Sequence, residues 1–147
     1  MARIQLALNV SDVDAAVDFY SKLFGVEPAK RRPGYANFAV DEPALKLVLI
    51  ENREAPATLN HLGVEVAGTD EVAATAARLA GEGLDTRVED NVTCCYAVQD
   101  KVWVTDPDGA PWEVYTVLAD ADSLAPAPTA DTASEGDAPC CAPSRSR

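Results

Sequence analysis

Two pairs of adjacent cysteines, Cys94-Cys95 and Cys140-Cys141, are the most unusual chemical feature of this chain. A ring closed between neighbouring residues is strained and joins no distant segments, so the adjacency argues against a framework of structural disulfides. Two thiolates side by side form a soft bidentate ligand that suits a thiophilic centre such as trivalent arsenic or cadmium. The alternative is that one cysteine is a small buried apolar residue. Adjacent residues on a regular strand face opposite ways, so a chelating pair requires irregular backbone.

His61 is the only histidine of the chain. A site that needs two imidazoles from one chain is therefore excluded, and with it the zinc motifs of the His-x-x-x-His kind. A single imidazole can still combine with carboxylate and amide oxygens, and this donor set suits a divalent first-row metal. The strands around His61 decide which partners it has.

An internal repeat supplies the first partner. Sliding the sequence by 56 residues aligns residues 5–10 with residues 61–66, and Gln5 then falls on His61. The same shift of 56 residues aligns a strand, a helix start, a helix core position and a helix-ending glycine, which indicates an internal duplication. The further matched pairs are Asp14 with Asp70, Leu23 with Leu79 and Gly25 with Gly81.

Each repeat opens with a six-residue alternation of apolar and polar side chains, the period-2 pattern of a strand packed on one face. A helix is expected after each of these strands, because helical spacing of apolar residues follows a capping residue. The expected helices run from Ser11 or Asp12 to Gly25 and from Thr69 or Asp70 through Leu79. Further strands are expected at 35–40, 45–50, 85–91, 101–105 and 112–118, with a turn at 106–109 before the last.

The alternation also decides which polar side chains share a face. If the apolar residues of the first strand pack against the helices, Gln5 points to the opposite side of the sheet, and by the repeat so does His61. On the last strand the bulky Trp112 belongs against the core, which sends Glu113 to the polar side. Gln5, His61 and Glu113 should then converge inside a curved sheet, where three ligands leave room for substrate and dioxygen. The alternative is three ordinary polar residues on a wet sheet face.

Composition limits the range of partners. The 147 residues carry 24 acidic and 12 basic side chains, and the net charge of -12 repels nucleic acid and the anionic face of a membrane. No apolar stretch approaches the roughly 20 residues of a membrane span, and the N-terminus lacks a secretory apolar region. We therefore expect a cytoplasmic protein with neither nucleic acid nor membrane as a partner.

From residue 119 the sequence changes to mostly Ala, Pro, Asp, Ser and Thr. Such a segment cannot bury enough surface to offset the entropy of ordering it. We expect one domain over residues 1–118, with modules at about 3–52 and 58–118, and a disordered tail over 119–147. Cys140-Cys141 lies in that tail, where it could capture a thiophilic ion or be a passive thiol pair.

Three motifs carry a family resemblance across residues 3 to 118: Phe19-Tyr20-Ser21-Lys22-Leu23-Phe24-Gly25, His61-Leu62-Gly63, and Asp106-Pro107-Asp108-Gly109 followed by Trp112-Glu113. Together they resemble the vicinal oxygen chelate superfamily, which includes glyoxalases, extradiol dioxygenases and fosfomycin or bleomycin resistance proteins. The resemblance implies an α+β fold in which two tandem βαβββ modules form a curved mixed sheet around a metal cup. It also places the metal ligands on Gln5, His61 and Glu113.

Two departures favour one branch of that superfamily. Gln5 stands where a histidine is common, and residues 46–48 offer no carboxylate as a fourth ligand. With Cys94-Cys95, the set is similar to that of the iron-dependent carbon-arsenic lyases, whose members are also described as cadmium-induced proteins. The resemblance implies Fe(II) on Gln5, His61 and Glu113, a trivalent organoarsenical such as methylarsenite on the cysteines, and dioxygen as co-substrate.

Two other functions remain open at this point. One is a non-catalytic arsenic- or cadmium-binding protein whose thiols sequester the ion. The other is a fosfomycin-type thiol transferase, which would depend on an added thiol and on Mn(II). The sequence also leaves open whether aliphatic or aromatic arsenicals are preferred, and whether the chain acts as a monomer or a homodimer.

Overall fold

The order of elements repeats once along the chain. The computed structural model describes residues 2–122, and within them a strand, a helix and three strands occur twice in succession. Module 1 comprises β1 (Arg3–Val10), α1 (Val13–Phe24), β2 (Lys30–Arg32), β3 (Tyr35–Val40) and β4 (Leu45–Glu51). Module 2 comprises β5 (Thr58–Glu65), α2 (Thr69–Gly81), β6 (Thr86–Cys94), β7 (Ala97–Thr105) and β8 (Pro111–Asp120). The expected pair of βαβββ modules is confirmed.

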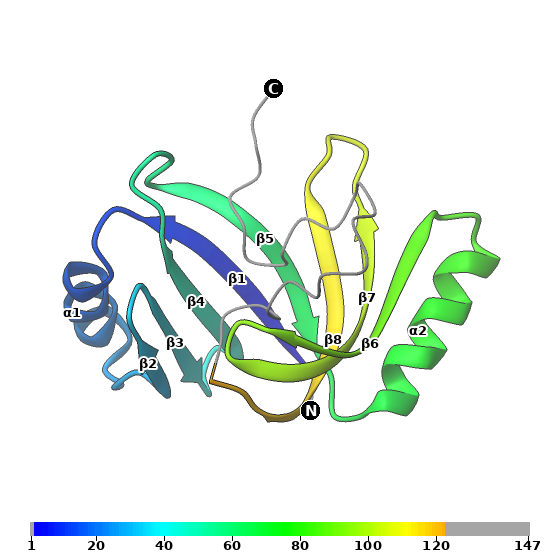
Figure 1. Cartoon of the computed structure of the whole chain (residues 1–147), viewed down its shortest axis with the longest axis horizontal. Coiled ribbons are helices and arrows are strands. Elements are labelled where there is room, and N and C mark those ends of the chain that lie inside the picture. The colour runs from blue at the N-terminus through cyan, green and yellow to red at the C-terminus, as the bar shows by residue number, and fades with distance from the viewer. Residues whose placement is uncertain (1, 123–147) are drawn as a thin grey trace, which may run out of the picture.

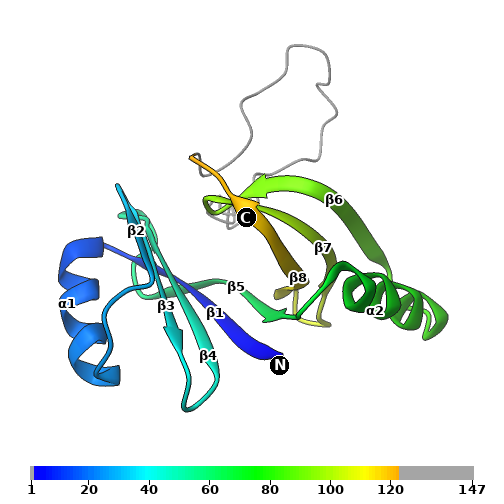
Figure 2. The same cartoon turned by 90° about the horizontal axis from the view of Figure 1, so that it is seen from below.

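The eight strands of the described residues form one mixed sheet in the order β2-β3-β4-β1-β5-β8-β7-β6. β1 runs parallel to β4 and β5 parallel to β8, whereas β1 and β5 pair antiparallel and join the two modules. Figures 1 and 2 show that the sheet curls into a half-barrel with α1 and α2 outside it at opposite ends. The concave face is therefore shared by both modules, as expected from the sequence.

The first module illustrates why these elements form. Asp12 caps α1 by accepting hydrogen bonds from the backbone nitrogens of Asp14 at 2.9 Å and Ala15 at 3.1 Å, and Gly25 ends the helix in the left-handed region with φ 67°. The apolar face of α1 packs on the convex side of β1, β3 and β4. The alternate residues of β1, Gln5, Ala7 and Asn9, are buried on the concave side.

Several expected boundaries are wrong. Gly81 does not end α2 in the left-handed region; it is the last helical residue, and Gly83 has the positive φ of 83°. β2 was not expected, because Lys30-Arg31-Arg32 has no apolar alternation. Strands were expected at 85–91 and 101–105, which implied a loop between them. β6 and β7 extend into this stretch and leave only a tight hairpin turn, and β8 continues to Asp120.

Most of the expected tail, including Cys140-Cys141, lies outside the described residues. Neither helix in the described part of the chain has the length and apolar character needed to cross a membrane.

Candidate functional site

Gln5, His61 and Glu113 meet on the concave face, on the adjacent strands β1, β5 and β8. The Gln5 Nε2 atom lies 3.0 Å from His61 Nε2 and 3.0 Å from Glu113 Oε1, and the last two atoms are 3.2 Å apart. The three residues are only 3%, 1% and 2% exposed. The sequence-based expectation that they converge therefore agrees with the geometry.

Gly63 makes this approach feasible. It pairs with Gln5 on β1 and with Glu113 on β8, and so lies between them. A Cβ atom at Gly63 would lie 3.0 Å from Glu113 Cγ, 3.0 Å from the Glu113 carbonyl oxygen and 3.5 Å from Gln5 Cβ. The missing side chain leaves room for both functional groups.

The spacing of the three groups fits a divalent cation. Two ligands at right angles and about 2.1 Å from one ion are roughly 3 Å apart, which matches the edges of this triangle. Gln5 would turn its amide so that Oε1 faces the ion, an exchange of two nearly isosteric ends. The described residues contain no cluster of three His, Cys, Asp or Glu side chains that could hold a metal, so a metal here requires the amide as its third donor.

A chain of asparagines orients the imidazole. His61 Nδ1 lies 2.7 Å from Asn60 Oδ1, and Asn60 Nδ2 donates to Asn9 Oδ1 at 3.1 Å. Asn9 is in turn held by Thr58 Oγ1 at 2.9 Å. Because Asn60 Oδ1 can only accept, Nδ1 carries the proton and the Nε2 lone pair faces Gln5 and Glu113.

Lys101 is the member of this cluster that sequence reasoning missed. Its Nζ lies 2.7 Å from Glu113 Oε2, and its side chain is fully buried between the rings of Trp103 and Tyr115. Burial opposes ionisation of Glu113, but the ion pair with the buried Lys101 ammonium outweighs it, and the pKa of Glu113 is lowered to about 2. Period-2 alternation along β7, paired with β8, was the signal that could have placed Lys101 there.

Cys94 and Cys95 lie at the tip of the β6–β7 hairpin. Cys94 is the last residue of β6, and the turn residues Cys95 and Tyr96 have positive φ angles of 52° and 61°. This irregular backbone brings the two Sγ atoms to 3.4 Å from each other, and the cysteines are only 1% and 9% exposed. The expected loop is thus a tight turn, while the requirement for irregular backbone is met.

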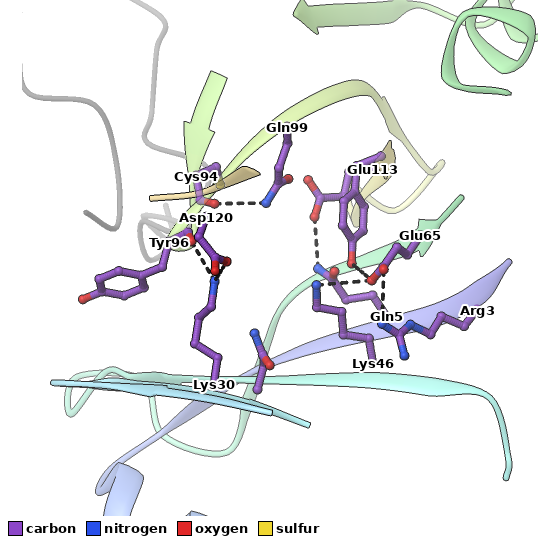
Figure 3. A network of polar contacts seen from close by, with 12 residues as sticks. Arg3, Gln5, Lys30, Lys46, Glu65, Cys94, Tyr96, Gln99, Glu113 and Asp120 are labelled. Atoms are coloured by element: carbon purple, nitrogen blue, oxygen red, sulfur yellow. Dashed lines mark hydrogen bonds and ion pairs between the residues drawn. The ribbon is translucent and has the colours of Figure 1, made fainter. Parts of the chain in front are cut away.

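One cleft on the concave face connects the two groups. Its volume is about 230 Å³, and Gln5, Glu113 and Cys95 all line it. Figure 3 shows the cysteine turn on one side of this space and Gln5 with Glu113 on the other. The other acidic and basic residues that line it are Arg3, Lys30, Lys46, Glu65 and Asp120.

Lys46 occupies the module 1 position where a fourth carboxylate ligand was sought. Its Nζ lies 3.2 Å from Glu65 Oε2, and Arg3 contacts the other oxygen of Glu65 at 3.1 Å. Burial lowers the pKa of Lys46, although Glu65 opposes this effect. A cation at this position cannot bind a metal ion while protonated, which leaves the candidate centre with three protein ligands.

The chain is similar in sequence to a known protein superfamily and to individual proteins within it. A model of the Glyoxalase/Bleomycin resistance protein/Dioxygenase superfamily matches residues 3–114. The chain is 57% identical over 141 residues to the cadmium-induced protein CadI of Mycobacterium tuberculosis (strain ATCC 25618 / H37Rv). The aligned region covers 96% of this chain and 93% of that protein. The chain is 58% identical over 144 residues to the trivalent organoarsenical cleaving enzyme of Thermomonospora curvata, with 97% and 90% covered.

Among solved structures, an extradiol ring-cleaving dioxygenase from B. fuscum superposes with a TM-score of 0.58 at 20% identity. The superposition covers 82% of this chain and 34% of that chain. At this identity the likeness concerns the fold alone.

Proposed function

The chain belongs to the Glyoxalase/Bleomycin resistance protein/Dioxygenase superfamily, and from that membership we propose that it is an Fe(II)-dependent dioxygenase acting on trivalent organoarsenicals. It cleaves the carbon-arsenic bond of a substrate such as methylarsenite with one dioxygen, which oxidises the methyl carbon to formaldehyde while arsenic leaves as arsenite: CH3As(OH)2 + O2 gives As(OH)3 + CH2O. The observation that carries this proposal is the shared cleft, which Gln5 and Glu113 line together with Cys95. The name of the relative from Thermomonospora curvata, a trivalent organoarsenical cleaving enzyme, supports the choice of substrate.

The thiols of Cys94 and Cys95 hold the substrate. When reduced, two sulfurs about this far apart can both bond to one trivalent arsenic and leave its organic substituent free. The positions of both cysteines are set by the folded hairpin, so binding directs the substituent into the cleft. The organic substituent is then held beside the candidate metal site, so its reaction there does not require a bimolecular encounter.

Gln5, His61 and Glu113 are the proposed metal ligands. Ferrous iron bound there would supply the activation of dioxygen. Asn60 keeps the proton on His61 Nδ1 and so leaves Nε2 free to bind metal, and Lys101 occupies Glu113 Oε2 and so leaves Oε1. Burial of all three ligands excludes bulk water from the place where the carbon-arsenic bond breaks.

The test is to add methylarsenite to anaerobically iron-loaded protein, with a phosphine as reductant so that no competing thiol is present. We expect oxygen consumption and arsenite release in proportion once air is admitted. Cys94→Ser and Cys95→Ser each leave one thiol, which lacks the chelate's advantage, so turnover should fall by orders of magnitude. Fully active Ser variants would contradict the proposal.

The second candidate function is a non-catalytic arsenic- or cadmium-binding protein. The two adjacent sulfurs of Cys94 and Cys95 favour it, as does the name of the relative CadI, a cadmium-induced protein. Under the same conditions such a protein would bind methylarsenite without consuming oxygen. A fosfomycin-type thiol transferase would instead need an added thiol and Mn(II), and would be indifferent to oxygen.

A further inference from the structure

Lys30 reaches across the cleft from one module to the other. It lies on β2 in module 1, yet its Nζ donates to the Tyr96 carbonyl oxygen at 2.8 Å and to Asp120 Oδ1 at 2.6 Å, both in module 2. Figure 3 shows the side chain standing up from its strand toward these two acceptors. Tyr96 directly follows Cys95, so Lys30 is bonded to the backbone of the turn that carries the thiols.

This turn depends on contacts from outside itself. Cys95 and Tyr96 both have positive φ angles, which disfavour residues with a Cβ atom, and neither is the glycine or asparagine that such turns usually contain. The Tyr96 ring packs on Tyr35 with centroids 5.0 Å apart, and Arg32 lies over it at 5.9 Å. The Ala121 nitrogen also donates to the Tyr96 oxygen at 3.0 Å. Module 1 thus supplies much of the support for a module 2 turn.

The charge of Lys30 strengthens this support. Its side chain is only 16% exposed, and its hydrogen bond to the Tyr96 carbonyl is partly shielded from water, whereas the bond to Asp120 is exposed. A bond from a charged donor is shorter and stronger than one between neutral groups. Asp120, which is well exposed, balances the charge, while the carbonyl of Tyr96 is the contact that bears on the thiols.

We propose that Lys30 is a positioning residue that fixes the Cys94-Cys95 turn relative to Gln5 and Glu113. This inference rests on the proposed function, in which arsenic on the thiols must place its organic group over the metal site. Among the described residues, Lys30 donates to the Tyr96 carbonyl and to Asp120, not to a sulfur or a proposed metal ligand, so it acts through the Tyr96 carbonyl. Its loss should leave the two thiols able to bind arsenic but aim the substituent away from the metal site.

The main test compares Lys30→Met, which keeps the apolar stem, with Lys30→Arg, which keeps charge and donors. In the iron-loaded protein, Lys30→Met should lower kcat on the order of tenfold to a hundredfold, the effect of a small misplacement. Its Kd for arsenite should stay within about twofold of wild type, and Lys30→Arg should recover part of kcat. The control is Lys22→Met, which removes an exposed lysine paired only with Asp18 on α1 and should change neither quantity.

Two results would overturn the proposal: an unchanged kcat in Lys30→Met, or a loss of arsenite affinity as large as the loss of kcat. If Lys30→Met does not fold, Lys30→Gln keeps a shorter donor and is judged by the same two measurements. Amide hydrogen exchange gives a readout that is independent of activity. Residues 94–97 should exchange faster in Lys30→Met and not in Lys22→Met, even if the wild type released no arsenite; unchanged exchange would refute the role of Lys30.

Discussion

The ionised state of Glu113 depends on Lys101. A carboxylate that is 2% exposed would ordinarily take up a proton, yet the pKa of Glu113 lies near 2 because a buried ammonium contacts it. The pair therefore keeps an anionic oxygen facing His61 across the whole physiological range. Removing one partner would leave the other buried and uncompensated, which typically costs about 3 to 5 kcal/mol.

The first prediction concerns acid stability of the metal-free protein. The pKa of Glu113 is lower in the folded state than in the unfolded chain, so its contribution to stability is fully present above about pH 4.5 and is lost as the pH falls toward 2. Glu113→Gln should therefore be less stable than wild type at pH 7, and the difference should shrink between pH 4.5 and 2. Urea unfolding at a series of pH values measures this, and a constant difference would contradict the assigned ion pair.

The second prediction concerns His61 and its asparagine. Because no other imidazole exists in the chain, His61→Ala should reduce iron affinity by more than the roughly tenfold to hundredfold expected for Asn60→Ala, which loses only the orienting bond. Arsenite binding should survive in both variants, since the thiols lie on another hairpin. Iron content after dialysis and arsenite affinity measure the two effects. Normal iron content in His61→Ala would exclude a metal site at this position.

Strand pairing accounts for the close approach at the candidate metal site. β5 lies between β1 and β8, and Gly63 is the residue of β5 flanked by Gln5 and Glu113. His61, two residues earlier on the same face, completes the triangle. The geometry of the site is therefore a property of three strands in register rather than of loops.

The third prediction follows from that register. In Gly63→Ala the new Cβ would lie 3.0 Å from Glu113 atoms and would push Glu113 and Gln5 apart, so iron affinity and turnover should fall at least tenfold while the sheet persists. Gly81→Ala is the matched control, because a Cβ there meets nothing within 4 Å. Equal iron affinity in the two variants would show that the three groups need not be this close.

Strands with a clear alternation of apolar and polar residues could be predicted from the sequence, whereas elements without that alternation could not. β1 and β5 alternate cleanly, so their faces, and with them Gln5 and His61, followed from the sequence. β2 is a short basic strand, and the β6–β7 turn has Cys95 and Tyr96 where glycine or asparagine would have signalled a hairpin. That conformation depends on contacts from Lys30 and Tyr35, which are remote in sequence.

In the whole molecule, the candidate site is built from residues of both modules. Module 1 contributes Gln5 and the support of the thiol turn, and module 2 contributes His61, Glu113 and both cysteines. Residues of both modules line the cleft, where three basic side chains face three acidic ones: Arg3, Lys30 and Lys46 with Glu65, Glu113 and Asp120. A single module could not form this site.

The last prediction separates the two cysteine pairs. The candidate metal ligands, Cys94-Cys95 and the residues that support the cysteine turn all lie within residues 3–121, so a chain truncated after Asp122 keeps them together with the sheet. We expect it to fold and, with saturating methylarsenite and Fe(II), to release arsenite within a few fold of the full chain. Circular dichroism and the arsenite-release assay measure these outcomes. A folded but inactive truncation, beside an active Cys94→Ser or Cys95→Ser variant of the full chain, would make Cys140-Cys141 the working thiols instead.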